Sequence, residues 1–191
     1  MIEQTIPADT LHDADCGIWD IPATSGVDRI FAAGYRDEAT AQYLSQVTPL
    51  YAALSRVLAQ LSGLMLLSLT TRRGGGALDL DHAIYATATE QLREAGERLR
   101  ALRVPQAAVR HHAAMGDCAE HLQAVARDMQ KLTASLGALR AAGQRDIIRQ
   151  LHVAQRLLIA TAEPDARITP VDFSNACCSC GAAHAPRHAK T

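Results

Sequence analysis

The most regular pattern in this chain lies between residues 111 and 139, where apolar or weakly polar residues recur at alternating gaps of four and three. These gaps place every member on one face of an α-helix, which turns once in 3.6 residues. A β-strand would distribute them over both of its faces. The pattern therefore predicts an amphipathic helix with one buried seam. The members of the seam are His111, Met115, Cys118, Leu122, Val125, Met129, Leu132, Leu136 and Leu139.

A first helix is predicted from Asp37–Glu38 to about residue 71, because two acids suit an N-terminal turn and a continuous seam follows them. Pro49 should bend or split this helix, since its ring removes one backbone hydrogen bond. The sequence Arg72-Arg73-Gly74-Gly75-Gly76 should end it. The seam comprises Leu44, Val47, Tyr51, Leu54, Leu58, Leu61 and Met65.

Two more helices complete the set. One covers residues 79–103, with Asp79 as its N-cap, and the other covers residues 145–162. Pro105 suits the first turn of the helix that carries the 111–139 pattern, and Gly143 suits its C-terminal cap. The seam of the 79–103 helix comprises Ile84, Ala88, Leu92, Ala95, Leu99 and Leu102. That of the last helix comprises Ile147, Ile148, Leu151 and Leu158.

These elements predict an all-α protein, because helix-forming residues dominate and aromatic residues make up only 4% of the chain. We expect an antiparallel four-helix bundle over residues 37–163. An irregular acidic N-terminal arm, residues 1–36, precedes it, and a coil tail with a Cys/His cluster, residues 164–191, follows it. The fourth helix is expected to be the shortest, so another segment or a second protomer should cover the longer helices. A dimer is the expectation.

Charge and hydropathy exclude several functions. Residues 1–38 carry eight acids and two arginines, so the remaining chain is +5 within a total of −1, which favours no nucleic-acid partner. Residues 57–71 are uncharged, but fifteen residues span only about 22 Å, short of a membrane crossing. The N-terminus lacks a basic and apolar leader, so the expected location is the cytoplasm with free thiols.

The C-terminal tail has the most distinctive chemistry. Three of the five cysteines, Cys177, Cys178 and Cys180, lie within four residues, and His184 and His188 follow. Thiolate and imidazole groups are the ligands that Zn²⁺ and Cu⁺ prefer. The spacing matches no standard zinc module, so a metal site and a redox-prone flexible end both remain open.

A second candidate site lies on the predicted seam itself. His111, Met115 and Cys118 point into the bundle, where helical bundles hold metals and haem. Met and Cys are also ordinary core residues, and a buried His can stay neutral when hydrogen-bonded. Metal or haem binding and structural packing are both open at this stage.

Two functions follow from these patterns. The first is a non-enzymatic helical-bundle subunit or adaptor that contacts another protein or a second copy of itself, with metal or redox responsiveness in its Cys/His tail. The alternative is a bundle that binds a metal (Zn or Cu) or haem, with ligands from the third helix, the tail or both.

Overall fold

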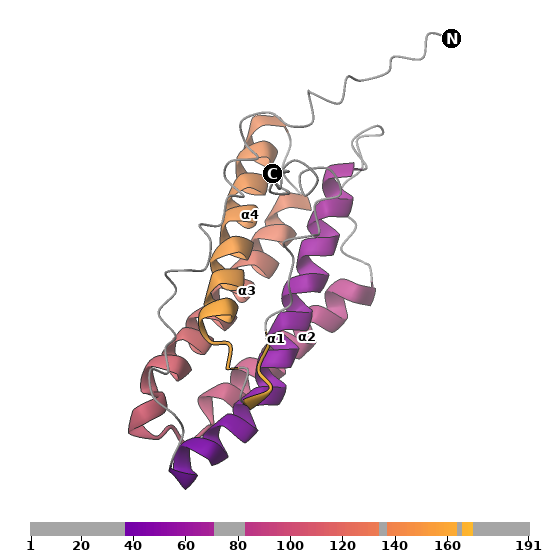
Figure 1. The fold of residues 1–191 in the computed structure, drawn as a ribbon. Helices are drawn as coiled ribbons and strands as arrows, with labels where there is room; N and C mark the ends of the chain where they lie inside the picture. Colours follow the sequence, from indigo (N-terminus) through magenta and orange to yellow (C-terminus); the bar gives the residue numbers. More distant parts are fainter. Residues whose placement is uncertain (1–36, 71–82, 134–136, 164–165, 170–191) are drawn as a thin grey trace, which may run out of the picture.

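A computed structural model describes residues 37–70, 83–133, 137–163 and 166–169 of the 191-residue chain. The described residues form four α-helices. Figure 1 shows that these helices lie side by side and alternate in direction, which confirms the predicted all-α antiparallel bundle. In chain order the elements are α1 (Glu38–Thr70), α2 (Ala83–Arg100), a short 3-10 turn η4 (Gln106–Ala108), α3 (Val109–Thr133) and α4 (Gly137–Ala160).

The first helix begins where the sequence predicts. Asp37 caps α1 by accepting hydrogen bonds from the backbone N–H of Thr40 at 2.7 Å and from its hydroxyl at 2.7 Å. These bonds hold the pKa of Asp37 below its usual value. The helix then runs through Pro49 without interruption, so the expected split at that residue does not occur. Leu50 and Tyr51, which directly follow Pro49, are buried in the core and keep this part of α1 packed against the bundle.

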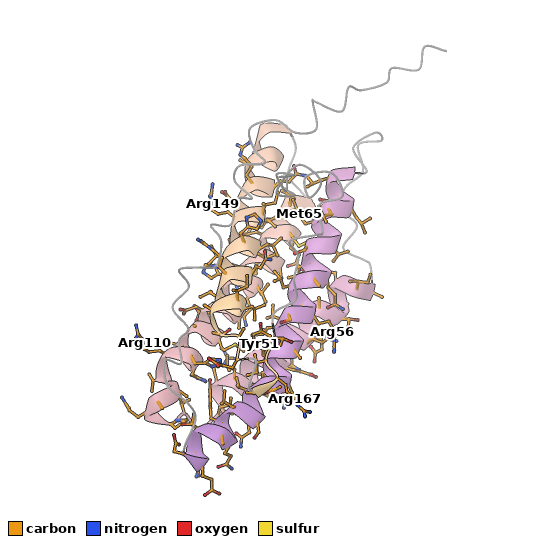
Figure 2. The ribbon with its side chains drawn as sticks, viewed as in Figure 1. Tyr51, Arg56, Met65, Arg110, Arg149 and Arg167 are labelled. Carbon is orange, nitrogen blue, oxygen red and sulfur yellow. The ribbon has the colours of Figure 1, made fainter. Side chains whose placement is uncertain are left out.

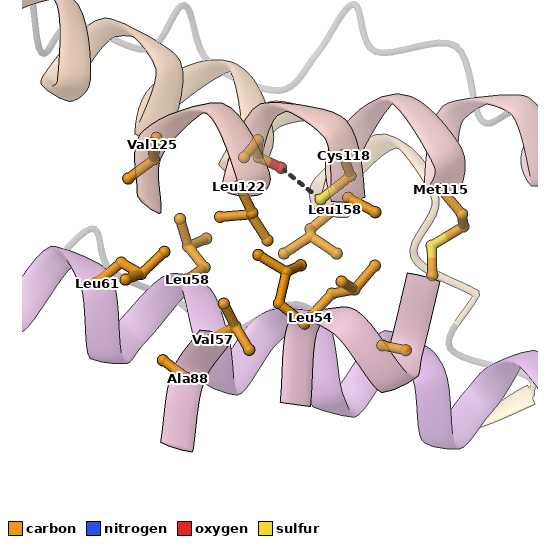
Figure 3. Close-up of a cluster of buried hydrophobic side chains, with 14 of the residues drawn as sticks. Leu54, Val57, Leu58, Leu61, Ala88, Met115, Cys118, Leu122, Val125 and Leu158 are labelled. Carbon is orange, nitrogen blue, oxygen red and sulfur yellow. Dashed lines mark hydrogen bonds between the residues drawn. The ribbon is translucent and has the colours of Figure 1, made fainter. Parts of the chain in front are cut away.

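The core lies along the seams that the sequence predicts. Every predicted seam residue of α1 is at most 4% exposed, and His111, Met115, Cys118 and Leu122 on α3 are fully buried. Figure 3 shows how side chains of α1 and α3 interdigitate, with residues of the other two helices beside them. The labelled set is Leu54, Val57, Leu58, Leu61, Ala88, Met115, Cys118, Leu122, Val125 and Leu158. Figure 2 places Arg110 and Arg149 on the outside of the bundle.

The buried face of α2 differs by one residue from the prediction at its start. Ile84 is 39% exposed, whereas Tyr85 is buried and its hydroxyl donates to the carbonyl of Ala126 at 3.0 Å. Tyr85 can occupy the buried position, in place of the predicted Ile84, because its hydroxyl finds a hydrogen-bond acceptor at the edge of the core. The rest of the predicted α2 seam is confirmed for Ala88, Leu92, Ala95 and Leu99.

The boundary between the last two helices was predicted wrongly. α3 ends at Thr133 and α4 begins at Gly137, so Leu139 and Gly143 belong to α4. The apolar residues of the two helices happen to continue one spacing, and periodicity alone cannot reveal a break between segments that are in phase. As a result α4 has 24 residues, and the shortest of the four is α2 with 18.

A short turn closed by a β-bridge, between Glu163 and Ile168 and called the clasp below, follows α4. Glu163 and Ile168 form an antiparallel bridge, with the Glu163 N–H donating to the Ile168 carbonyl at 2.8 Å and the Ile168 N–H returning at 2.9 Å. Arg167 has φ of 61°, a left-handed conformation that turns the chain back. Ile168 is fully buried, so a residue that the sequence assigns to the coil tail belongs to the bundle core.

α1 is also the only described helix that is long and apolar enough to cross a membrane, judged by length and composition alone. Core helices of bundles pass the same test. Val57, Leu61 and Met65 of this helix are buried inside the bundle.

Candidate functional site

His111, the first residue of the predicted metal site on α3, lies at the centre of a buried hydrogen-bond chain. Its Nδ1 is 2.9 Å from the hydroxyl of Tyr43 on α1, and its Nε2 is 3.0 Å from the carbonyl of Thr161 after α4. A carbonyl only accepts, so Nε2 carries the proton and Nδ1 accepts from the Tyr43 hydroxyl. Both ring nitrogens are therefore engaged within the protein.

The electrostatics agree with a neutral imidazole. Burial lowers the pKa of His111, and the neighbouring His112 lowers it further, while the bond to Thr161 acts in the opposite direction. Burial also raises the pKa of Tyr43 well above its usual value. The two rings meet edge to face, with centroids 5.7 Å apart. Neither group is charged near neutral pH, which suits an interior without a counter-ion.

Met115 and Cys118, the other two predicted ligands on α3, are fully buried core residues. The thiol of Cys118 lies 3.6 Å from the carbonyl of Ala154 on α4 (Figure 3). Burial raises the pKa of this thiol to about 12, so it stays protonated. A thiol, not a thiolate, makes a poor metal ligand or nucleophile.

Of the two interpretations that the sequence leaves open for this group, the geometry favours packing. Within the described ranges, no three His, Cys, Asp or Glu side chains gather closely enough to hold a metal ion. Metal or haem binding by His111, Met115 and Cys118 stays a prediction, and it would require the Tyr43–His111–Thr161 chain to rearrange.

The predicted ligands in the C-terminal tail lie outside the described residues. Cys177, Cys178, Cys180, His184 and His188 therefore stay predictions of a metal or redox site. The clasp places the last described residues beside Thr161, whose carbonyl bonds to His111. Tyr43, near the start of α1, is at the same end of the bundle.

Two buried polar atoms near this end have no hydrogen-bond partner among the described groups: Nδ1 of His112 and Oε1 of Glu163. Burial lowers the pKa of His112, whose ring lies 6.1 Å from that of Tyr43. Glu163 is only 3% exposed. Sequence reasoning missed Tyr43, Thr161 and Glu163, because no local motif links residues that meet only through the fold.

A different kind of candidate surface, the leucine surface formed by Leu66 and Leu67, lies at the opposite end of α1. Leu66 is 60% exposed and Leu67 is 57% exposed, and both lie outside the buried seam that continues through Met65 and Ser68. The sequence signal for this surface was available, since two adjacent leucines interrupt the gaps of three and four that follow the core. The 57–71 stretch that contains them has no charged residue.

Comparison of the chain with protein-family models, with curated proteins and with solved structures gave no match.

Proposed function

We propose that this chain is a non-enzymatic helical-bundle subunit that acts through protein–protein contact, and that the end of α1 is its contact surface. The observation that carries the proposal is the exposure of Leu66 and Leu67, at 60% and 57%, in an uncharged part of the longest helix. Contiguous exposed apolar side chains mark interaction surfaces, and Leu66 and Leu67 are neighbours in the chain.

The bundle's helix lengths explain why this surface is available. α1 has 33 residues and α2, which packs beside it in the opposite direction, has only 18. Figure 1 shows that α1 continues well past the point where α2 begins. Ile84, near the start of α2, is also a large apolar residue that is 39% exposed.

A second copy of the chain is the partner that this surface suits best. In a two-fold symmetric dimer the same patch faces itself, so a charged patch would meet like charge. The leucine surface carries no charge and avoids that repulsion. Burying a leucine side chain fully contributes about 1.5–3 kcal/mol, so the two leucines of each copy supply a useful part of the association free energy.

The test replaces the two leucines in the full chain with Leu66→Glu and Leu67→Glu together. Both side chains are exposed, so the bundle should fold as before. The expected result is that sedimentation velocity shows a dimer for the unaltered protein and a monomer for the double variant. Val109→Glu is the matched control, because Val109 is 46% exposed but lies at the start of α3. It should leave the dimer intact.

A double variant that associates as strongly as the unaltered protein would overturn the proposed surface. A monomeric Val109→Glu control would show that any exposed charge prevents association, and would also overturn it. Circular dichroism of each variant confirms that the helices remain.

Metal or redox responsiveness is a separate part of the proposal and belongs to the tail. Elemental analysis of the purified protein tests it, since a stoichiometric amount of Zn or Cu is expected if Cys177, Cys178, Cys180, His184 and His188 bind metal. A metal content that is unchanged when these residues are replaced by Ala would contradict it.

A further inference from the structure

A groove lies between the first turns of α1 and the C-terminal end of α2, far from the leucine surface. Its volume is about 400 Å³. The lining residues are Ser45, Gln46, Pro49, Leu50, Arg98, Ala101 and Leu102. The proposed function does not use this groove, and its chemistry suggests a specific occupant.

The groove combines apolar surface with a free backbone acceptor. Pro49 and Leu102 supply the apolar surface, whereas Leu50 is buried in the core. Because Pro49 has no N–H, the carbonyl of Ser45, four residues earlier, lacks its usual helical donor. A flat apolar side chain that carries one N–H donor therefore matches this part of the groove. Tryptophan is the side chain with that combination.

One cationic side chain, that of Arg98, lines the groove, and no acidic residue lines it. The nearest acid in sequence, Glu97, already pairs with Arg93 at 2.7 Å. Arg98 makes no ion pair with any residue in the described part of the chain. An occupant with a carboxylate beside its aromatic ring would pair with this guanidinium.

One segment of the chain supplies both groups at adjacent positions. Trp19 is the only tryptophan, and Asp20 follows it, within an N-terminal arm whose first 36 residues carry six acids and two arginines. We infer that the N-terminal arm docks in this groove of its own bundle, with Trp19 over Pro49 and Leu102 and Asp20 paired with Arg98.

The length of the arm permits this contact. The arm joins α1 at Asp37, and Ser45 lies eight residues further along the helix, a rise of about 12 Å. Trp19 precedes Asp37 by eighteen positions, and this length of chain spans up to about 60 Å when extended. The segment therefore reaches the groove with chain to spare. A cation–π contact between Arg98 and the indole would add to the ion pair.

The sole tryptophan makes the inference testable in the full chain. Acrylamide quenching of Trp19 fluorescence should be weak in the unaltered protein and several-fold stronger in Arg98→Glu. Arg100→Glu is the matched control, because it makes the same charge change two residues away and outside the groove. It should leave the quenching as in the unaltered protein. Adding Asp20→Lys to Arg98→Glu should restore protection, because the ion pair is then reversed.

Three results would overturn the inference. The first is a Trp19 that is as accessible in the unaltered protein as in urea. The second is equal loss of protection in Arg98→Glu and Arg100→Glu. The third is protection that disappears on dilution, which would place the arm of a second copy in the groove. The leucine variants of α1 separate this test from the proposed function, since the groove contact should persist in a monomeric double variant.

Discussion

The hydroxyl of Tyr43 lies 2.9 Å from Nδ1 of His111, a contact between residues 68 positions apart in the interior of the bundle. Through the second nitrogen, His111 also reaches the carbonyl of Thr161 at 3.0 Å. One imidazole thus joins the start of α1, the start of α3 and the end of α4. This arrangement explains why a histidine occupies a seam that is otherwise apolar.

Replacing Tyr43 with Phe should destabilise the protein. The change removes the donor and leaves the buried Nδ1 of His111 unpaired, which costs about 1–3 kcal/mol. Urea unfolding followed by circular dichroism measures the loss. Tyr85→Phe is the control, because its hydroxyl bonds to a carbonyl inside α3 and should cost less. An equal loss in both variants would show that the Tyr43–His111 bond has no special weight.

The free energy of unfolding should fall as the pH is lowered through the histidine range. Burial lowers the pKa of His111, His112 and His152 in the folded protein, whereas the unfolded values lie near about 6.5. Below that pH the unfolded chain binds protons that the folded protein does not, so stability decreases. Above it the contribution is fully present.

Urea titrations at about pH 7.5 and about pH 5.5 test this dependence, because few other groups titrate between them. We expect a lower free energy of unfolding at the acidic pH, and a smaller difference in His111→Gln. Equal stability at both pH values would contradict the assignment of buried, neutral histidines.

The thiol of Cys118 should resist alkylation in the folded protein. Its side chain is fully buried, and burial raises its pKa to about 12. Iodoacetamide labelling followed by peptide mass spectrometry should modify Cys118 only after urea is added. Labelling of Cys118 in the native protein at the rate of a small-molecule thiol would show that this part of the core opens readily.

Two glycines inside helices should respond differently to alanine. A Cβ at Gly116 would have no atom within 4 Å, so Gly116→Ala should stabilise the protein by about 0.5–1 kcal/mol through helix propensity. A Cβ at Gly143 would lie 2.9 Å from the Cδ1 of buried Leu132. Gly143→Ala should therefore gain less or destabilise, because Leu132 must move within the core.

Thermal unfolding of the two variants measures the contrast. A stabilisation of equal size in both would mean that Leu132 adjusts freely at the contact between α3 and α4.

The sequence predicts the bundle well because each buried position, such as Leu54 or Leu122, requires an apolar side chain. These positions recur at the helical spacing, so the spacing reveals the helices. It misplaced the α3–α4 boundary because Leu132 and Leu139 stay in phase across the break. The spacing also predicts Ile84, and not Tyr85, in the core. Spacing alone contains no information about the hydrogen bond from the Tyr85 hydroxyl to the carbonyl of Ala126.

The candidate site was less predictable for a different reason. His111 was identified from its place on the seam, but its partners Tyr43 and Thr161 come from distant parts of the chain. Only the packed bundle shows that both of its nitrogens are engaged. The exposure of Leu66 and Leu67 was not predicted, although both residues fall outside the spacing of the buried seam.

Sedimentation equilibrium of the unaltered chain, in a reducing buffer with EDTA, tests the central claim of contact through the α1 leucines most directly. Reductant and chelator remove any association through the cysteines or a shared metal. We expect a dimer of twice the 20.5 kDa chain mass that becomes monomeric in the Leu66→Glu, Leu67→Glu protein. A chain that remains at 20.5 kDa at every concentration, or a dimer that survives both substitutions, would contradict it.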